Sequence, residues 1–294
     1  MPALGLTLLL VPAPQPSAAD GIGRVVVTPA RVTAGSTSTF TLTFIADTGA
    51  LEGQTLLDIP RGWSAPQMTR PGVTGYVSVA AGSCSSATKL TRVVGQRLII
   101  STSCRRGQSF QLTYGPATAS TLATDGYVFL TQTKPTLGLT KTTLVKVKTI
   151  VKGKNGRKRT KTTTRRIITR IKPSFRPLAA KKQPIVVVTG GPVDHLALNA
   201  PTIATAGTPF GITVRAEDAY GNPALGYGSA VSFSSSDSEA FLPEPYRFQS
   251  TDLGAKTFSR VILRHAGTQT ITVTDDAGRA DVSNPITVYS FLTG

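Results

Sequence analysis

The sequence contains few of the residues from which metal centres and active sites are usually built. Its 294 residues include two His, two Cys and one Trp. A Cys/His zinc cluster needs about four such ligands, and we expect none in this chain. No stretch of 18 or more apolar residues is present, so we expect no membrane-spanning helix. Common nucleotide, hydrolase and metalloprotease motifs are also absent, and we expect a non-enzymatic protein without a cofactor.

Charged residues are scarce as well, at 16% of the chain against about 25% in typical globular proteins. Thr, Ser, Val and Ala take their place, with 28 Gly and 20 Pro between them. Val and Thr favour strands, whereas Gly and Pro favour turns. No segment repeats its apolar residues with a helical period over three turns. The composition therefore predicts an all-β protein, and the length predicts two domains.

Short β-type runs follow one another along the chain, separated by turn residues. In 40–44, Phe and Leu alternate with Thr, so that Phe40, Leu42 and Phe44 share one apolar face. This spacing is typical of β-sandwiches, and we predict two tandem Ig-like ones. The first spans 20–189, the second spans 193–290, and 190–192 links them. The predicted strands include 25–27, 40–44, 55–57, 76–79, 97–101, 110–114, 127–131, 183–188, 195–198, 210–216, 230–233, 257–263, 268–274 and 285–288.

The N-terminal residues 1–19 are predicted to be a signal peptide. A short apolar run is followed by Ser17 and Ala19, which have the −3 and −1 spacing of a cleavage site. No basic residue precedes the apolar run, so a buried N-terminal strand is the alternative. Export would make the protein secreted, extracellular or associated with the cell wall.

The two cysteines, Cys84 and Cys104, stand twenty positions apart on either side of a strand-like run. In an oxidising compartment they are expected to form one structural disulfide. A reactive thiol is the alternative, but it would need a neighbouring base to lower its pKa. The sequence shows no such base.

Several phrases of the second module carry a family resemblance, namely 204–243, 246–259 and 266–278, which include the segment Asp218 to Asn222. They resemble bacterial extracellular Ig-like repeats of the invasin and intimin style. The first module resembles, more weakly, a β-sandwich repeat of actinobacterial surface proteins. The resemblance implies structural or adhesive duty and brings no catalytic residues. Trp63, which follows Pro60-Arg61-Gly62, is expected to fill the core between two sheets.

Half of the basic residues lie in one seventh of the chain. Between 141 and 182 there are sixteen Lys or Arg and no acid, whereas the rest of the chain is near neutral. Asn155-Gly156 predicts a tight hairpin turn, which would place Lys152 opposite Arg159 and Lys154 opposite Arg157. Such like-charged pairs destabilise a hairpin. The predicted polyanion-binding residues are Lys146, Lys148, Lys152, Lys154, Arg157, Lys158, Arg159, Lys161, Arg165, Arg166, Arg170 and Lys172.

Two hypotheses of function follow. The first is a secreted or cell-surface structural or adhesion protein of a bacterial envelope, with a host or cell-surface protein as partner. The second is capture of a polyanion by the hairpin at about 141–175: teichoic acid, an acidic glycan or extracellular nucleic acid. Apart from Phe175 no aromatic accompanies the basic residues, which argues against base stacking. A solvated arm without a ligand is the simpler alternative.

Few other residues suggest chemistry. His195 and His265 are expected at strand ends on the surface. Asp275, Asp276 and Asp281 could bind Ca²⁺ through clustered carboxylates, but an acidic hairpin turn containing Gly278 is the favoured explanation.

Overall fold

The computed structural model describes residues 21–136, 139–152 and 158–290. Within these ranges the helical structure consists of two single 3-10 turns, η1 (Ala180–Lys182) and η2 (Ser250–Asp252), and the rest is strands and loops. No described helix has the length and apolar character needed to cross a membrane. The all-β prediction is therefore confirmed. The predicted signal peptide and the Asn155-Gly156 turn lie outside the described residues.

The described chain forms two compact units. The first contains the residues up to Pro29 together with Thr39–Ala117 and Val128–Ile185. The second contains Ala30–Ser38, Thr118–Tyr127 and the chain from Val186 onward. The domain boundary at 190–192 stays a prediction.

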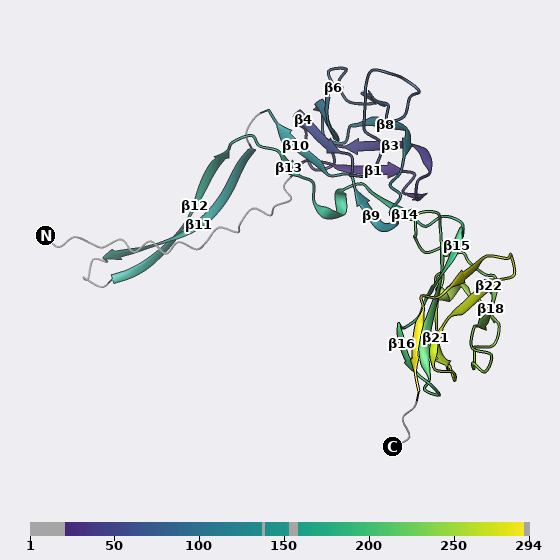
Figure 1. Cartoon of the computed structure of the whole chain (residues 1–294). Coiled ribbons are helices and arrows are strands. Elements are labelled where there is room, and N and C mark those ends of the chain that lie inside the picture. Colours follow the sequence, from purple (N-terminus) through teal and green to yellow (C-terminus); the bar gives the residue numbers. More distant parts are fainter. Residues whose placement is uncertain (1–20, 137–138, 153–157, 291–294) are drawn as a thin grey trace. The chain divides into compact units, whose positions relative to one another are not determined.

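Two sheets build the β-sandwich of the first unit (Figure 1). One has the order β1 (Arg24–Thr28), β3 (Thr37–Ile45), β8 (Ser109–Thr118) and β5 (Val77–Ala80). The other has the order β13 (Arg176–Pro177), β10 (Thr131–Pro135), β4 (Leu51–Asp58), β7 (Arg97–Cys104) and β6 (Lys89–Val94). Because side chains alternate along each strand, one face of each sheet is directed toward the other sheet. Residues from both sheets line a small internal void.

The core of this sandwich is aromatic. Phe40 and Phe44 of β3 are at most 1% exposed, as the alternation of 40–44 predicts. Trp63 packs edge-on against Phe40 and Phe129, with ring centroids 5.2 and 5.1 Å away. Such edge-to-face pairs stabilise beyond the area they bury. The prediction that Trp63 fills the core is confirmed.

A disulfide joins Cys84, in the turn after β5, to Cys104 at the end of β7. The Cα atoms are 4.5 Å apart, and both residues are buried. The predicted pairing is confirmed, and the described residues contain no free cysteine. The bond ties the β5–β6 connection to the sheet that contains β7.

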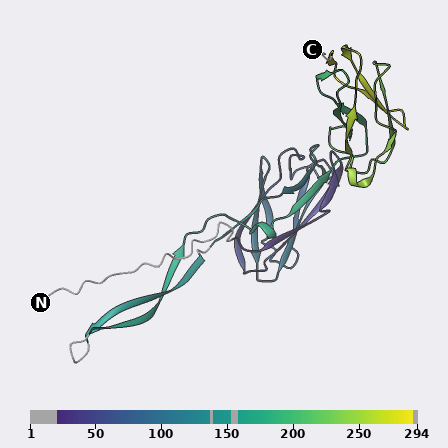
Figure 2. The ribbon, with the colours of Figure 1, turned by 90° about the horizontal axis from the view of Figure 1, so that it is seen from below.

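The basic stretch forms a two-stranded antiparallel ribbon of β11 (Leu139–Lys152) and β12 (Lys158–Ile171). Each strand has fourteen residues. The two strands wind around each other, as expected for a two-stranded sheet (Figure 2). They form a sheet of their own, and no other described strand pairs with either edge.

The register of this ribbon corrects the sequence-based pairing. Lys152 lies opposite Lys158, not Arg159, because β12 is displaced by one residue from the predicted alignment. The predicted alignment would also have set Lys146 opposite Arg165. In the observed one, Lys146 faces Thr164, and Lys152–Lys158 is the one directly opposed like-charged pair in the register. The shift therefore removes most of the repulsion, and no ligand is needed to offset it.

Four sheets make up the second unit. A three-stranded sheet contains β2 (Arg31–Thr33), β14 (Ile185–Thr189) and β9 (Thr124–Val128). The sandwich that follows has three sheets. The first has the order β15 (His195–Asn199), β17 (Phe210–Glu217) and β20 (Ala255–Val261), and the second has the order β16 (Ile203–Thr205), β24 (Ile286–Tyr289) and β21 (Gly267–Gln269). The third has the order β19 (Tyr246–Arg247), β18 (Ala230–Ser235), β22 (Ile271–Asp275) and β23 (Ala280–Val282). Its core contains fully buried Ile212, Val214 and Val273.

Two predicted strands are each divided in the structure. The run 268–274 covers β21 and β22, which belong to different sheets. Thr270 lies between them, where its N–H donates to Ser236 Oγ and its C=O accepts from Ser235 Oγ. The run 127–131 likewise spans the end of β9 and the start of β10. Apolar runs alone do not reveal a strand that changes sheet.

The loop at 218–222 is fixed by buried polar side chains of the second unit. Asp218 accepts hydrogen bonds from the backbone N–H of Gly191, Tyr220 and Asn222 at 2.8–2.9 Å. The Asn222 amide donates to Thr121 O at 2.8 Å, and its oxygen accepts from Ala123 N–H at 2.8 Å. Both side chains are at most 4% exposed. The predicted turn at Asp218–Asn222 therefore also holds residues 121–123.

Removal of the disulfide should destabilise the protein without unfolding it. Replacing Cys84 and Cys104 by Ala opens a loop of twenty residues, whose closure lowers the entropy of the unfolded chain. The free energy of unfolding should fall by about 3 kcal/mol, measured by guanidinium titration. A reducing agent should lower the stability of the wild type alone. A loss well below 1 kcal/mol in the variant would contradict this account.

Candidate functional site

The two faces of the ribbon carry different side chains. Lys146, Lys148 and Arg166 share one face with Thr162 and Thr164, and all five are exposed. We call this surface the Lys–Thr face. Because side chains alternate along a strand, the neighbouring residues belong to the opposite face.

On that opposite face Val145 and Val147 are half-buried, and Thr163 and Arg165 lie across from them. It therefore presents one described cation, whereas the Lys–Thr face presents three. Apolar residues continue along both faces, since Leu144, Ile167 and Ile168 are 49–69% exposed.

The described cations of the ribbon have no acidic partner. No ion pair of the described residues involves Lys146, Lys148, Arg165, Arg166 or Lys172. Elsewhere many of the charges are paired. Arg97, for example, makes two hydrogen bonds of 2.6 and 2.8 Å with Asp58. The ribbon therefore combines high local charge with ammonium and guanidinium groups directed to solvent.

The remaining predicted polyanion-binding residues are not all placed. Lys154 and Arg157 lie outside the described residues, as do the side chains of Lys152, Lys158, Arg159, Lys161 and Arg170. Their backbone positions, except for Lys154 and Arg157, belong to β11 and β12. The structure therefore brings Lys146, Lys148 and Arg166 to one face and sets Arg165 on the other.

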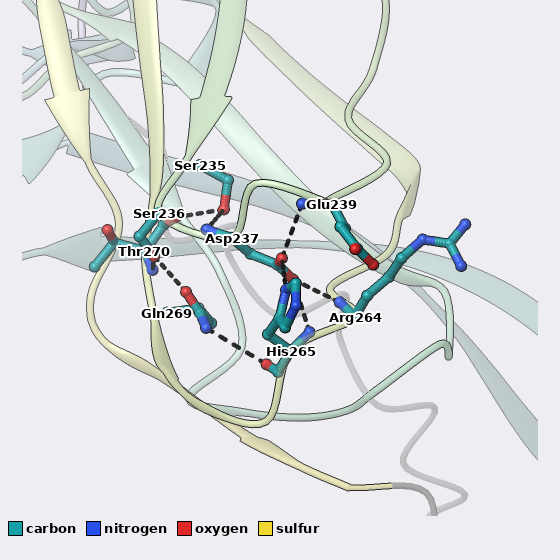
Figure 3. Close-up of polar contacts among 8 residues, drawn as sticks. All are labelled: Ser235, Ser236, Asp237, Glu239, Arg264, His265, Gln269 and Thr270. Carbon is teal, nitrogen blue, oxygen red and sulfur yellow. Dashed lines mark hydrogen bonds and ion pairs between the residues drawn. The ribbon is translucent and has the colours of Figure 1, made fainter.

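A second polar cluster surrounds Asp237 in the loop after β18 (Figure 3). The Asp237 side chain is fully buried and accepts hydrogen bonds from the N–H of Glu239, Arg264 and His265 at 3.1, 2.6 and 3.0 Å. His265 Nδ1 also contacts it at 2.6 Å. No sequence motif marks this carboxylate, because its partners lie up to 28 positions away.

The charges of this pair stabilise each other. Burial alone would raise the pKa of Asp237, but the His265 ring and the three N–H groups hold it far below its usual range. The hydrogen bond to Asp237 and its negative charge raise the pKa of His265. The His265 side chain is 53% exposed whereas that of Asp237 is fully buried, so solvent reaches the pair from the His265 side.

An aspartate–histidine pair can serve general-base catalysis, but this one lacks a nucleophile. Among the described residues no Ser, Thr or Cys side chain hydrogen bonds to the His265 ring, and Ser236 bonds to Gln269 Oε1 instead. Asp237 is engaged by backbone groups of two loops. We conclude that the cluster fastens the loop after β18 to the segment before β21.

The acidic residues considered for Ca²⁺ have separate protein partners. Asp275 accepts from Tyr227, from the N–H of Ala277 and from the Arg279 side chain at 3.1, 3.0 and 2.9 Å. Asp276 contacts Arg247 at 3.4 Å, and Asp281 accepts from Leu198 N–H at 2.6 Å. The described residues contain no cluster of three possible metal ligands. Asp275 belongs to a hairpin turn, in which Gly278 has a φ of 82° and donates its N–H to the backbone oxygen of Asp275.

A surface depression of the second unit offers little chemistry. It has a volume of about 350 Å³ and lies between residues 241–244 and strand β20. Glu244 and Arg260 are its charged residues, and no His or Cys lines it. His195 lies elsewhere, at the start of β15, with Asp194 and Glu217 at 3.2 and 3.5 Å.

The Asp237–His265 pair should give the second unit a measurable pH dependence. A raised His265 pKa stabilises the fold below about pH 6.5, and this contribution is lost as the pH rises through the raised value. Asp237 acts in the other direction, since its lowered pKa stabilises above about pH 4 and is lost in stronger acid. His265→Gln should therefore reduce the free energy of unfolding more at about pH 5.5 than at about pH 9.

Urea titrations at both pH values measure this difference. In an Asp237→Asn background the same His265→Gln substitution should have an equal effect at the two pH values. A pH-dependent effect that persists in that background would assign the titration to another group.

Comparison with known proteins adds little to this geometry. No family model matches the chain, and no curated protein matches it. A crystal structure of an ICAM-5 D1–D4 ectodomain fragment is similar, with 12% identity and a TM-score of 0.22, over 92% of this chain and 77% of that chain. A likeness this weak carries no functional argument. The described architecture is that of tandem β-sandwiches, and no family is assigned to the chain.

Proposed function

We propose that the protein is a non-enzymatic, secreted or cell-surface structural and adhesion protein of a bacterial envelope, which binds an anionic polymer through the β11–β12 ribbon. The unpaired cations of the ribbon are the observation that carries this proposal. Four exposed cations lie within a few residues of one another on paired strands, and no described acid neutralises them. Binding of a polyanion would release its counterions, which is a strong driving force at low salt.

Several features support an extracellular role. The disulfide is typical of proteins that fold in oxidising compartments. The predicted signal peptide and the resemblance of the second module to bacterial Ig-like repeats agree with it. The two sandwiches supply rigid modules, and the polar clusters at Asp218, Asp237 and Asp275 are engaged in holding loops.

The spacer interpretation is the main competitor. On that view the ribbon is a solvated arm and adhesion, if any, involves a host or cell-surface protein. The repulsion between opposed like charges, which the sequence suggested, no longer favours a polyanion, because the observed register avoids most of it. The proposal therefore depends on exposure and unpaired charge alone.

A charge-matched pair of variants tests the proposal. Replacing Lys146, Lys148, Arg165 and Arg166 by Ser removes four ribbon cations. Affinity for heparin and for isolated cell-wall polymers should fall on the order of 100-fold near 0.1 M salt, and the slope of log K against log salt should become shallower by about 2–3. Both follow from titration at several salt concentrations.

The control replaces four exposed cations of the first unit outside the ribbon, namely Arg61, Arg70, Lys89 and Arg105. It has the same net charge as the ribbon variant, and its affinity should stay within a few-fold of the wild type. Equal losses in the two variants would mean that net charge alone is responsible. A wild type that binds no anionic polymer would leave the spacer interpretation.

A further inference from the structure

We infer that the Lys–Thr face binds a linear phosphodiester polymer with a three-carbon polyol repeat, and that its threonine hydroxyls donate hydrogen bonds to the phosphates. This inference rests on the proposed function and specifies its face and its ligand class. It uses Lys146, Lys148, Thr162, Thr164 and Arg166, whose side chains are all described and exposed.

Each lysine of this face has a hydroxyl directly across from it. Lys146 is opposite Thr164, and Lys148 is opposite Thr162. Directly opposed Cβ atoms lie about 4.5–5.5 Å apart, so an ammonium and a hydroxyl can reach the same anion. A phosphodiester has one negative charge and two non-bridging oxygens. One Lys–Thr pair therefore offers it one compensating charge and one neutral donor.

The pairs recur at an interval that a polymer can match. Lys146 and Lys148 are two residues apart on one strand, which corresponds to about 6.8 Å. Arg166 lies diagonally across from Lys146 at about 7–8 Å and continues the series. An extended backbone advances about 3.5 Å in three single bonds, so about six bonds between phosphates give the same interval. A chain of phosphates joined through three carbons has this repeat.

Single-stranded nucleic acid has a similar spacing between phosphates but usually requires aromatic stacking. No aromatic residue occurs in β11 or β12. Base stacking on aromatic side chains contributes about 1–3 kcal/mol per base where it is present. A polymer that carries no bases loses nothing on this surface, so we commit to the polyol phosphate.

Two matched pairs of single substitutions in the full chain test the inference. Lys146→Ser and Arg165→Ser each remove one exposed cation, on the Lys–Thr face and on the opposite face respectively. Thr164→Val and Thr163→Val each replace a hydroxyl by a methyl group of similar shape, again on the two faces. The ligands are poly(glycerol phosphate) and an oligothymidylate with the same number of phosphates, and binding is measured by calorimetry at several salt concentrations.

Lys146→Ser should weaken binding of poly(glycerol phosphate) about fivefold near 0.1 M salt, as expected for one lost phosphate contact. Thr164→Val should weaken it about threefold to tenfold with an unchanged salt slope, because a neutral donor is lost. Arg165→Ser and Thr163→Val should each change it less than twofold. Oligothymidylate should bind less tightly than poly(glycerol phosphate).

The failures of the two proposals are distinguishable. Binding that weakens equally in both members of each pair would overturn the choice of face but leave the ribbon as the binding element. Tighter binding of oligothymidylate would overturn the ligand class. No binding of either polymer, or of heparin, by the wild type would overturn the proposed function itself.

Discussion

In the second unit, several backbone N–H groups of loops pair with no strand, and the carboxylates of buried aspartates accept their hydrogen bonds. Asp218, Asp237 and Asp275 each accept two or more backbone N–H groups, and Asp252 accepts one at the start of η2. Leaving such groups unsatisfied would cost about 1–3 kcal/mol each, which is a large fraction of the stability of a domain. Aspartate carboxylates therefore fix several of the connections between the strands of this sandwich.

This use of the acids has an electrostatic consequence. The chain has 15 acidic residues against 32 basic ones, and several of the 15 are committed to loops. Asp47 and Asp58 of the first unit are engaged by Lys182 and Arg97. Since β11 and β12 themselves contain no acidic residue, the ribbon cations have no carboxylate partner on their own strands.

The sequence predicted those parts of the structure that depend on local pattern. The alternation at 40–44 placed Phe40 and Phe44 in the core, and the presence of two cysteines in a chain expected to be exported indicated the bond between Cys84 and Cys104. Properties that depend on distant partners could not be predicted. The ribbon register is displaced by one residue, which sets Lys146 and Lys148 opposite threonines and avoids most of the repulsion. An Asn-Gly turn signal does not encode this preference. Asp237 showed no signal, since it bonds residues 27 and 28 positions later.

The isolated pairing of β11 with β12 also affects how copies of the protein meet. Two fourteen-residue strands with outer edges that no other described strand covers would be a template for edge-to-edge aggregation. Positive charge along such an edge keeps neighbouring molecules apart, and this protection acts over about 10 Å at 0.1 M salt but only about 3 Å at 1 M. Concentrated salt therefore removes a colloidal barrier, and the protein should remain monomeric most readily in dilute buffer.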